Sequence, residues 1–189
     1  MVRKFVVLMC GCSLLGMIVS QTASAAEPIK SGLQPGEKIT TIFEPINVTG
    51  EHAGEPYCLI CENGLSPVAM LFAREVSEPL LRLLTKIDEA TGKNRDKQMG
   101  SFVVFLSNKE GLQEQLQAAA KKRGLKHIVL SIDQPAGPEG FNVSKDADVT
   151  VVLYHDHLVK ANHAFRPGEL TDQASDKILA DLPNILATK

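Results

Sequence analysis

The chain has 189 residues, of which 20 are basic and 22 acidic, and its formal net charge is −2. This balance, without a basic stripe or a polybasic run, excludes the usual electrostatic basis for binding nucleic acid or a membrane surface. The length suits one compact domain. Because tryptophan is absent and aromatic residues make up 5% of the chain, leucine, valine and isoleucine must fill the core.

The amino-terminal segment has the pattern of a cleavable export signal. Two basic residues precede an almost wholly apolar run over residues 5–19, and Ala23-Ser24-Ala25 offers small residues to a signal peptidase. The apolar run is shorter than a membrane-spanning helix requires. We therefore predict a signal peptide over residues 1–25 and a mildly acidic exported protein, located in a bacterial periplasm, with no membrane attachment after cleavage.

The next segment predicts a linker and then the start of a domain. Residues 26–38 contain two prolines and two glycines, so we expect a linker there, with the domain extending over residues 39–189. Residues 39–48 are rich in β-formers, but Pro45 interrupts them, which favours a short edge strand or hairpin. Residues 50–56 form a polar turn region.

A strand and a helix follow in the order typical of a parallel sheet. Residues 67–73 are continuously apolar, as a strand buried on both faces should be. Ser77 is a suitable helix N-cap, with Glu78 and Pro79 in the first turn, and the helix should end near Gly92. Apolar residues recur at helical spacing along it: Leu80, Leu83, Leu84 and Ile87.

The alternation of strand and helix then repeats. Residues 101–106 predict a second buried strand, and residues 107–108 can cap a helix over residues 109–123. Gly124 should end that helix, because glycine readily adopts the left-handed conformation that follows a helix. Residues 126–132 predict the third strand.

The carboxy-terminal part predicts a β-hairpin and a last helix. Residues 149–154 form the fourth strand, residues 155–156 a tight turn, and residues 158–165 the partner strand. Apolar spacing over residues 171–185 predicts an amphipathic helix, which Pro183 ends or kinks.

This order predicts an α/β fold with a central mixed sheet. The right-handed crossover rule makes the first three long strands parallel, the hairpin adds an antiparallel pair, and helices should cover both faces. The order, together with residues 43–50 (Phe-Glu-Pro-Ile-Asn-Val-Thr-Gly), the strand at 68–73 and the segment 149–165, resembles the thioredoxin fold over residues 36–185. The redoxin group that includes peroxiredoxin-like alkyl hydroperoxide reductase and thiol-specific antioxidant proteins is the most similar.

The resemblance implies two functional positions, and this chain differs at both. In thioredoxin-like oxidoreductases the reactive cysteine follows the first strand of the βαβ unit, at the start of the next helix, where residues 74–79 contain no cysteine here. The family also places a cis-proline just before the hairpin strand, where Asp148-Val149-Thr150 stands. No catalytic role is therefore transferred to these positions.

Cys58 and Cys61 form a CxxC pair that lies before the first long strand instead, and they are the only cysteines after residue 25. A bond between them needs a turn or helical bend, which the following Glu62-Asn63-Gly64 favours. We predict a thiol–disulfide oxidoreductase or redox protein acting on protein thiols or disulfides, with Cys58 as the attacking thiolate and Cys61 as the resolving thiol. His52 and Arg74 are the nearest candidates in sequence for lowering a thiol pKa.

Other interpretations of the pair remain open. The disulfide could be a structural clip, the thiols could stay reduced and inert, or the domain could be non-catalytic and bind a metal or a partner. Two thiolates are half of a zinc or copper site. Five histidines could complete it: His52, His127, His155, His157 and His163. Three of these share strand parity: His155, His157 and His163. We expect no cofactor, because Glu62 follows Cys61 and a haem-attachment motif needs histidine there.

Overall fold

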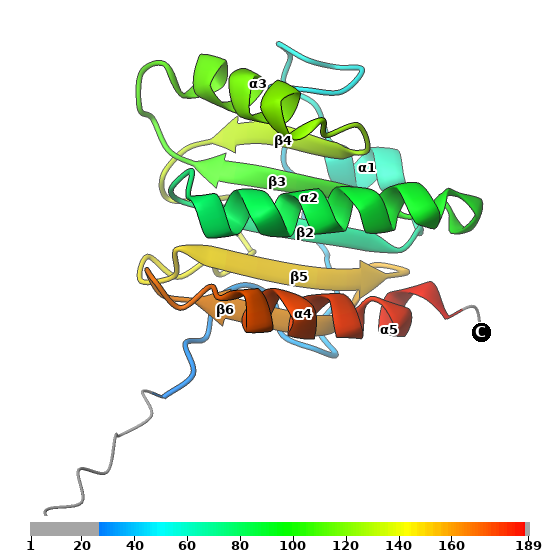
Figure 1. Ribbon diagram of the computed structural model, residues 1–189. Coiled ribbons are helices and arrows are strands. Elements are labelled where there is room, and N and C mark those ends of the chain that lie inside the picture. Colours follow the sequence, from blue (N-terminus) through cyan, green and yellow to red (C-terminus); the bar gives the residue numbers. More distant parts are fainter. Residues whose placement is uncertain (1–26, 188–189) are drawn as a thin grey trace, which may run out of the picture.

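The computed structural model describes residues 27–187 of the chain, so the predicted signal peptide lies outside the described residues and remains a prediction. Six strands form one sheet in the order β1-β4-β3-β2-β5-β6 (Figure 1). The strands are β1 (Ile46–Asn47), β2 (Val68–Ala73), β3 (Gly100–Leu106), β4 (Ile128–Asp133), β5 (Val149–His155) and β6 (Leu158–Phe165). The helices are α1 (Leu59–Asn63), α2 (Glu78–Lys93), α3 (Leu112–Arg123), α4 (Asp172–Asp181) and α5 (Pro183–Leu186), with a 3-10 turn η1 (Arg95–Lys97). Within residues 27–187, no helix is both long enough and apolar enough to span a membrane.

The strand directions agree with the prediction. β2, β3 and β4 are parallel, β5 pairs antiparallel with β2, and β6 pairs antiparallel with β5. The edge strand expected within residues 39–48 is reduced to the two residues of β1, which pair antiparallel with β4. Pro45, which directly precedes β1, cannot donate a backbone hydrogen bond, so the strand cannot extend through it.

The helices lie unequally on the two faces of the sheet. The connections β2-α2-β3 and β3-α3-β4 step in the same direction across the sheet, so right-handed crossovers place α2 and α3 on the same face. α4 joins them on that face, and α1 lies on the other (Figure 1). Helices on both faces are therefore confirmed, but non-helical residues complete the cover of the second face: Leu33, Ile39 and Phe141.

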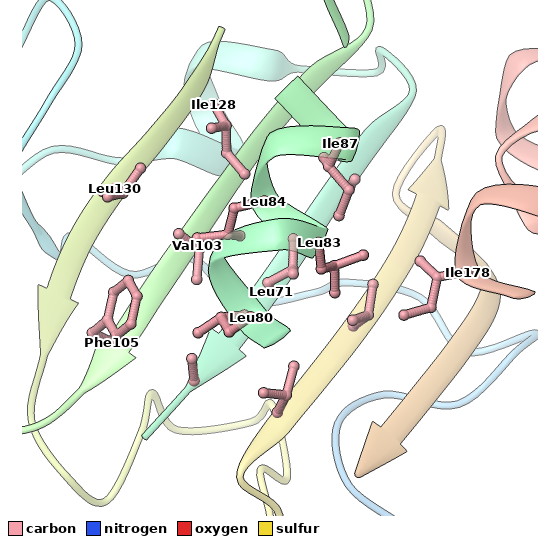
Figure 2. Packing of buried hydrophobic residues seen from close by; sticks show 14 of the residues in the cluster. Leu71, Leu80, Leu83, Leu84, Ile87, Val103, Phe105, Ile128, Leu130 and Ile178 are labelled. Carbon is pink, nitrogen blue, oxygen red and sulfur yellow. The ribbon is translucent and has the colours of Figure 1, made fainter. Parts of the chain in front are cut away.

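The larger core lies between the sheet and α2. Its α2 members are the four residues predicted from helical spacing, each 0% exposed: Leu80, Leu83, Leu84 and Ile87. Figure 2 shows these side chains between α2 and the sheet, around Leu71 and Val103 of the central strands. The N-cap of α2 is Ser77 as predicted, since its Oγ accepts a hydrogen bond from the Leu80 N–H at 3.4 Å.

A second core, on the opposite face of the sheet, includes Cys58. Cys58, Leu59 and Ile60 belong to the same buried cluster as Phe72 and Tyr154. Because α1 supplies Leu59 and Ile60, each 2% exposed, the cysteine segment is tied to the sheet by ordinary apolar packing.

Two predicted boundaries are wrong by a few residues. α3 begins at Leu112 rather than at residue 109, because Gly111 stands before it with a φ of 72°. Gly124, with a φ of 66°, ends α3 as expected. The hairpin turn is formed by Asp156 and His157, whose φ angles are 53° and 57°, so β5 continues through residue 155.

Candidate functional site

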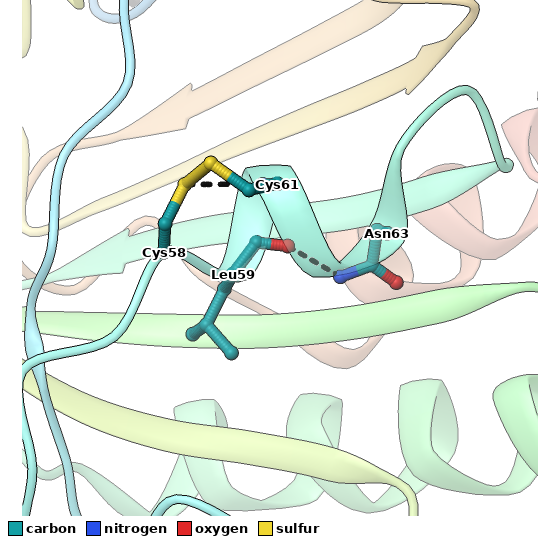
Figure 3. Close-up of a disulfide and its surroundings, with 4 residues drawn as sticks. All are labelled: Cys58, Leu59, Cys61 and Asn63. Carbon is teal, nitrogen blue, oxygen red and sulfur yellow. Dashed lines mark hydrogen bonds between the residues drawn. A yellow bond between two sulfur atoms is a disulfide. The ribbon is translucent and has the colours of Figure 1, made fainter.

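Cys58 and Cys61 are joined by a disulfide, with 5.3 Å between their Cα atoms (Figure 3). Cys58 is the N-cap of α1, and its Sγ accepts a hydrogen bond from the Cys61 N–H at 3.1 Å. The helical bend predicted for the pair is therefore the first turn of α1. The helix ends where Gly64 donates its N–H to the Ile60 carbonyl at 3.0 Å, which agrees with the turn predicted there. Sequence reasoning missed that Cys58 caps the helix, since cysteine is not among the usual capping residues.

The two cysteines differ in their access to solvent. Cys58 is 8% exposed, whereas Cys61 is an exposed residue. The cause is the orientation of α1, which buries Leu59 and Ile60 against the sheet and turns the next residue outward. A thiol in solution therefore reaches Cys61 more readily than Cys58.

Of the two residues suggested from the sequence, His52 lies beside the residue that precedes the pair. The His52 ring stacks on the ring of Tyr57, the residue before Cys58, with ring centroids 3.5 Å apart. Arg74 directly follows β2, and its guanidinium binds backbone carbonyls of the loop between β4 and β5.

Arg74 instead occupies the region where the family resemblance implies a reactive cysteine. Its guanidinium donates to the backbone carbonyls of Ala147, Pro135 and Ser144 at 3.1, 2.9 and 3.0 Å. These bonds hold the loop between β4 and β5 against the end of β2. No cis peptide bond occurs within residues 27–187. At the end of β2 the chain thus carries an arginine bound to three backbone carbonyls, where the family resemblance implies a cysteine.

The Asp148 carboxyl, at the position of the family's cis-proline, gives this region a pH dependence. Burial raises its pKa, Glu75 raises it further, and Arg74 partly opposes both. The folded state thus disfavours ionised Asp148. The penalty is absent well below the unfolded pKa of 3.8, grows as the pH rises above that value, and is complete above the raised folded pKa.

We therefore expect Asp148→Asn to raise the urea midpoint at neutral pH and to leave it unchanged below about pH 3.5. Unfolding curves at both pH values measure this difference. The exposed Asp146 provides the matched control, Asp146→Asn. An equal gain in the two variants at neutral pH would refute the assignment to Asp148.

The histidines do not assemble a metal site with the cysteines. The Asp156–His157 turn breaks the shared parity predicted for the hairpin histidines, and His163 instead pairs with Asp181 at 2.9 Å. Within residues 27–187 no three His, Cys, Asp or Glu side chains are grouped so as to hold a metal ion. The disulfide also occupies both sulfur atoms, so they are not free thiolates in this state.

Comparison with known proteins gives matches among solved structures, whereas no protein-family model and no curated protein matches the sequence. A candidate thiol:disulfide interchange protein, DsbE, from Chlorobium tepidum has a TM-score of 0.56 at 21% identity, over 79% of this chain and 99% of that one. A candidate protein disulfide isomerase from Bacteroides thetaiotaomicron has a TM-score of 0.62 at 15% identity, over 84% of this chain and 94% of that one. The peroxidoxin BcpB from Mycobacterium tuberculosis has a TM-score of 0.57 at 17% identity, over 81% of this chain and 98% of that one. The resemblance predicted from the sequence is confirmed at the level of the fold, and the chain is a thioredoxin-like α/β domain.

Proposed function

We propose that this protein is an exported thiol–disulfide redox protein that uses Cys58 and Cys61. The observation that carries the proposal is the asymmetry of the disulfide, in which Cys61 is exposed and Cys58 is shielded and accepts a backbone N–H. Similarity to proteins described as disulfide exchange proteins and a peroxidoxin supports it at the level of the fold. The substrates are protein thiols or disulfides.

The asymmetry gives each sulfur a distinct role. A substrate thiolate attacks Cys61 Sγ, the Cys58–Cys61 bond breaks, and its electron pair leaves on Cys58 Sγ. The Cys61 N–H stabilises that thiolate, and a leaving thiol of lower pKa leaves faster. A second substrate thiolate then attacks the first substrate sulfur and releases the Cys61 thiolate. The substrate gains a disulfide, and the pair, after taking up two protons, becomes a dithiol.

This assignment exchanges the roles predicted from the sequence. In the reverse direction Cys61 is the attacking thiolate on a substrate disulfide, and Cys58 resolves the mixed disulfide. The predicted signal peptide supports a location outside the cytoplasm, in the periplasm of a bacterium, where disulfides persist.

Exchange with a dithiol peptide tests the function. Oxidised protein lacking residues 1–25 is mixed with the reduced peptide, and mass spectrometry follows the substrate disulfide and any mixed disulfide. We expect turnover by the native protein. Cys58→Ser should trap a mixed disulfide when mixed with oxidised peptide, and Cys61→Ser should trap little, because its remaining thiol is shielded.

A synthetic peptide spanning residues 57–62 is the control for the contribution of the fold. Exchange no faster than with this peptide, together with a reduction potential below about −300 mV, would leave a structural clip as the function of the disulfide. A potential between about −270 and −120 mV supports redox activity. Faster trapping by Cys61→Ser than by Cys58→Ser would overturn the roles given to the two sulfurs.

A further inference from the structure

A polar cavity lies on the side of α1 away from the disulfide. Its volume is about 520 Å³, and α1, the turn after α2 and the amino ends of β3 and β4 surround it. Its principal lining residues are Leu59, Glu62, Asn63, Arg95, Gln98 and His127. Figure 3 shows the Leu59 side chain pointing away from the sulfur atoms. The cavity is also at the opposite end of β2 from the family's reactive position.

The backbone at His127 is fixed by Asp88, and the exposed imidazole lies against Gly92 at the cavity wall. The Asp88 carboxylate accepts the backbone N–H groups of Lys126, His127 and Ile128 through one oxygen, at 2.9, 2.6 and 2.9 Å. The ring also rests on Gly92 of α2, where an added Cβ would lie 2.7 Å from the imidazole Cδ2. A side chain at position 92 would displace the ring, so glycine is what allows this placement.

Asn63 is fixed in a similar way. Its Nδ2 donates to the Leu59 carbonyl at 2.7 Å, and its Oδ1 packs on Gly100, where an added Cβ would lie 1.7 Å away. At the rim, Gln98 has a φ of 58°, a left-handed conformation that is uncommon outside glycine. The polar wall therefore combines the held side chain of Asn63 with exposed polar side chains around it.

Two opposite charges line the cavity without neutralising each other. Within residues 27–187 neither Glu62 nor Arg95 takes part in an ion pair within 4.0 Å. Both are exposed residues, so their carboxyl and guanidinium groups are accessible to a ligand. A ligand carrying one negative and one positive group matches this arrangement better than a polyanion, which Glu62 would repel.

We infer that this cavity binds a short peptide through its free termini. Arg95 holds the terminal carboxylate through its forked N–H groups, and Glu62 holds the terminal ammonium. The side-chain amides of Asn63 and Gln98 supply the acceptors and donors that a peptide bond needs. The volume lies in the range of small-molecule sites. The site does not depend on the redox chemistry of Cys58 and Cys61.

Calorimetric titration of the oxidised protein with trialanine tests the inference. We expect saturable binding with a dissociation constant below about 1 mM, weakened about tenfold or more by Arg95→Gln and by Glu62→Gln. Lys97→Gln is the matched control, since Lys97 belongs to the same turn η1 but does not line the cavity. It should bind as the native protein does.

Blocked peptides identify which terminus each charge holds. N-acetylation should weaken binding to the native protein and have little further effect on Glu62→Gln, and amidation of the carboxylate should behave in the same way with Arg95→Gln. Equal binding of free and blocked trialanine, absence of saturable binding, or an equal loss in Lys97→Gln would overturn the site. The double variant Cys58→Ser/Cys61→Ser should retain trialanine binding, so failure of the redox function and failure of this site are distinguishable.

Discussion

Replacing Asp88 with leucine is expected to lower the free energy of unfolding by about 3 kcal/mol or more. Asp88 is 7% exposed, and its carboxylate is the acceptor for three consecutive backbone N–H groups at the start of β4. Leucine is similar in size but leaves these donors without an acceptor. Each donor that stays buried and unsatisfied costs about 1–3 kcal/mol, and donors that reach water cost less. Urea denaturation measures the loss.

Asp88→Asn is the control for this prediction. Its amide oxygen can still accept the three N–H groups, so we expect a smaller loss than in Asp88→Leu. Losses of the same size in the two variants would show that the three hydrogen bonds do not account for the stabilisation by Asp88.

Leu84→Ala is expected to destabilise the protein by about 3 kcal/mol, through lost burial and the cavity left behind. Leu84 is 0% exposed and lies in the core between α2 and the sheet (Figure 2). The same substitution at Leu65, which is 62% exposed, should change the free energy of unfolding by less than about 0.5 kcal/mol. Denaturant unfolding of both variants measures the contrast, and a loss at Leu65 as large as at Leu84 would contradict it.

The central elements could be predicted because burial leaves a local pattern. β2 is buried along its whole length, so its sequence is continuously apolar, and α2 repeats leucine at helical spacing. β1 could not be delimited in this way. Its two residues are strand only because they pair with β4, more than 80 positions away, and no local pattern encodes that pairing.

The parts of the candidate site that could be predicted are those set by residues close together in the sequence. The CxxC spacing and the following Gly64 together predicted the bend that became α1. The partners of Arg74 could not be predicted, because its guanidinium binds carbonyls 61 to 73 positions away and no local pattern encodes those contacts. The cavity was missed because Glu62, Arg95 and His127 come from separate segments, joined only by the packing of α1 and α2 on the sheet.

The placement of α2 and α3 on one face has a consequence for the cooperativity of the molecule. The opposite face, which carries Cys58, is covered by the five-residue α1 and by non-helical chain, so fewer ordered contacts resist its local opening. The disulfide closes a very short loop and therefore adds little to global stability. We therefore expect amide hydrogen exchange to be slower in the sheet and the long helices than in the segment that carries Cys58. Reduction of the disulfide is therefore expected to speed exchange in that segment and to leave exchange in the sheet and the long helices unchanged.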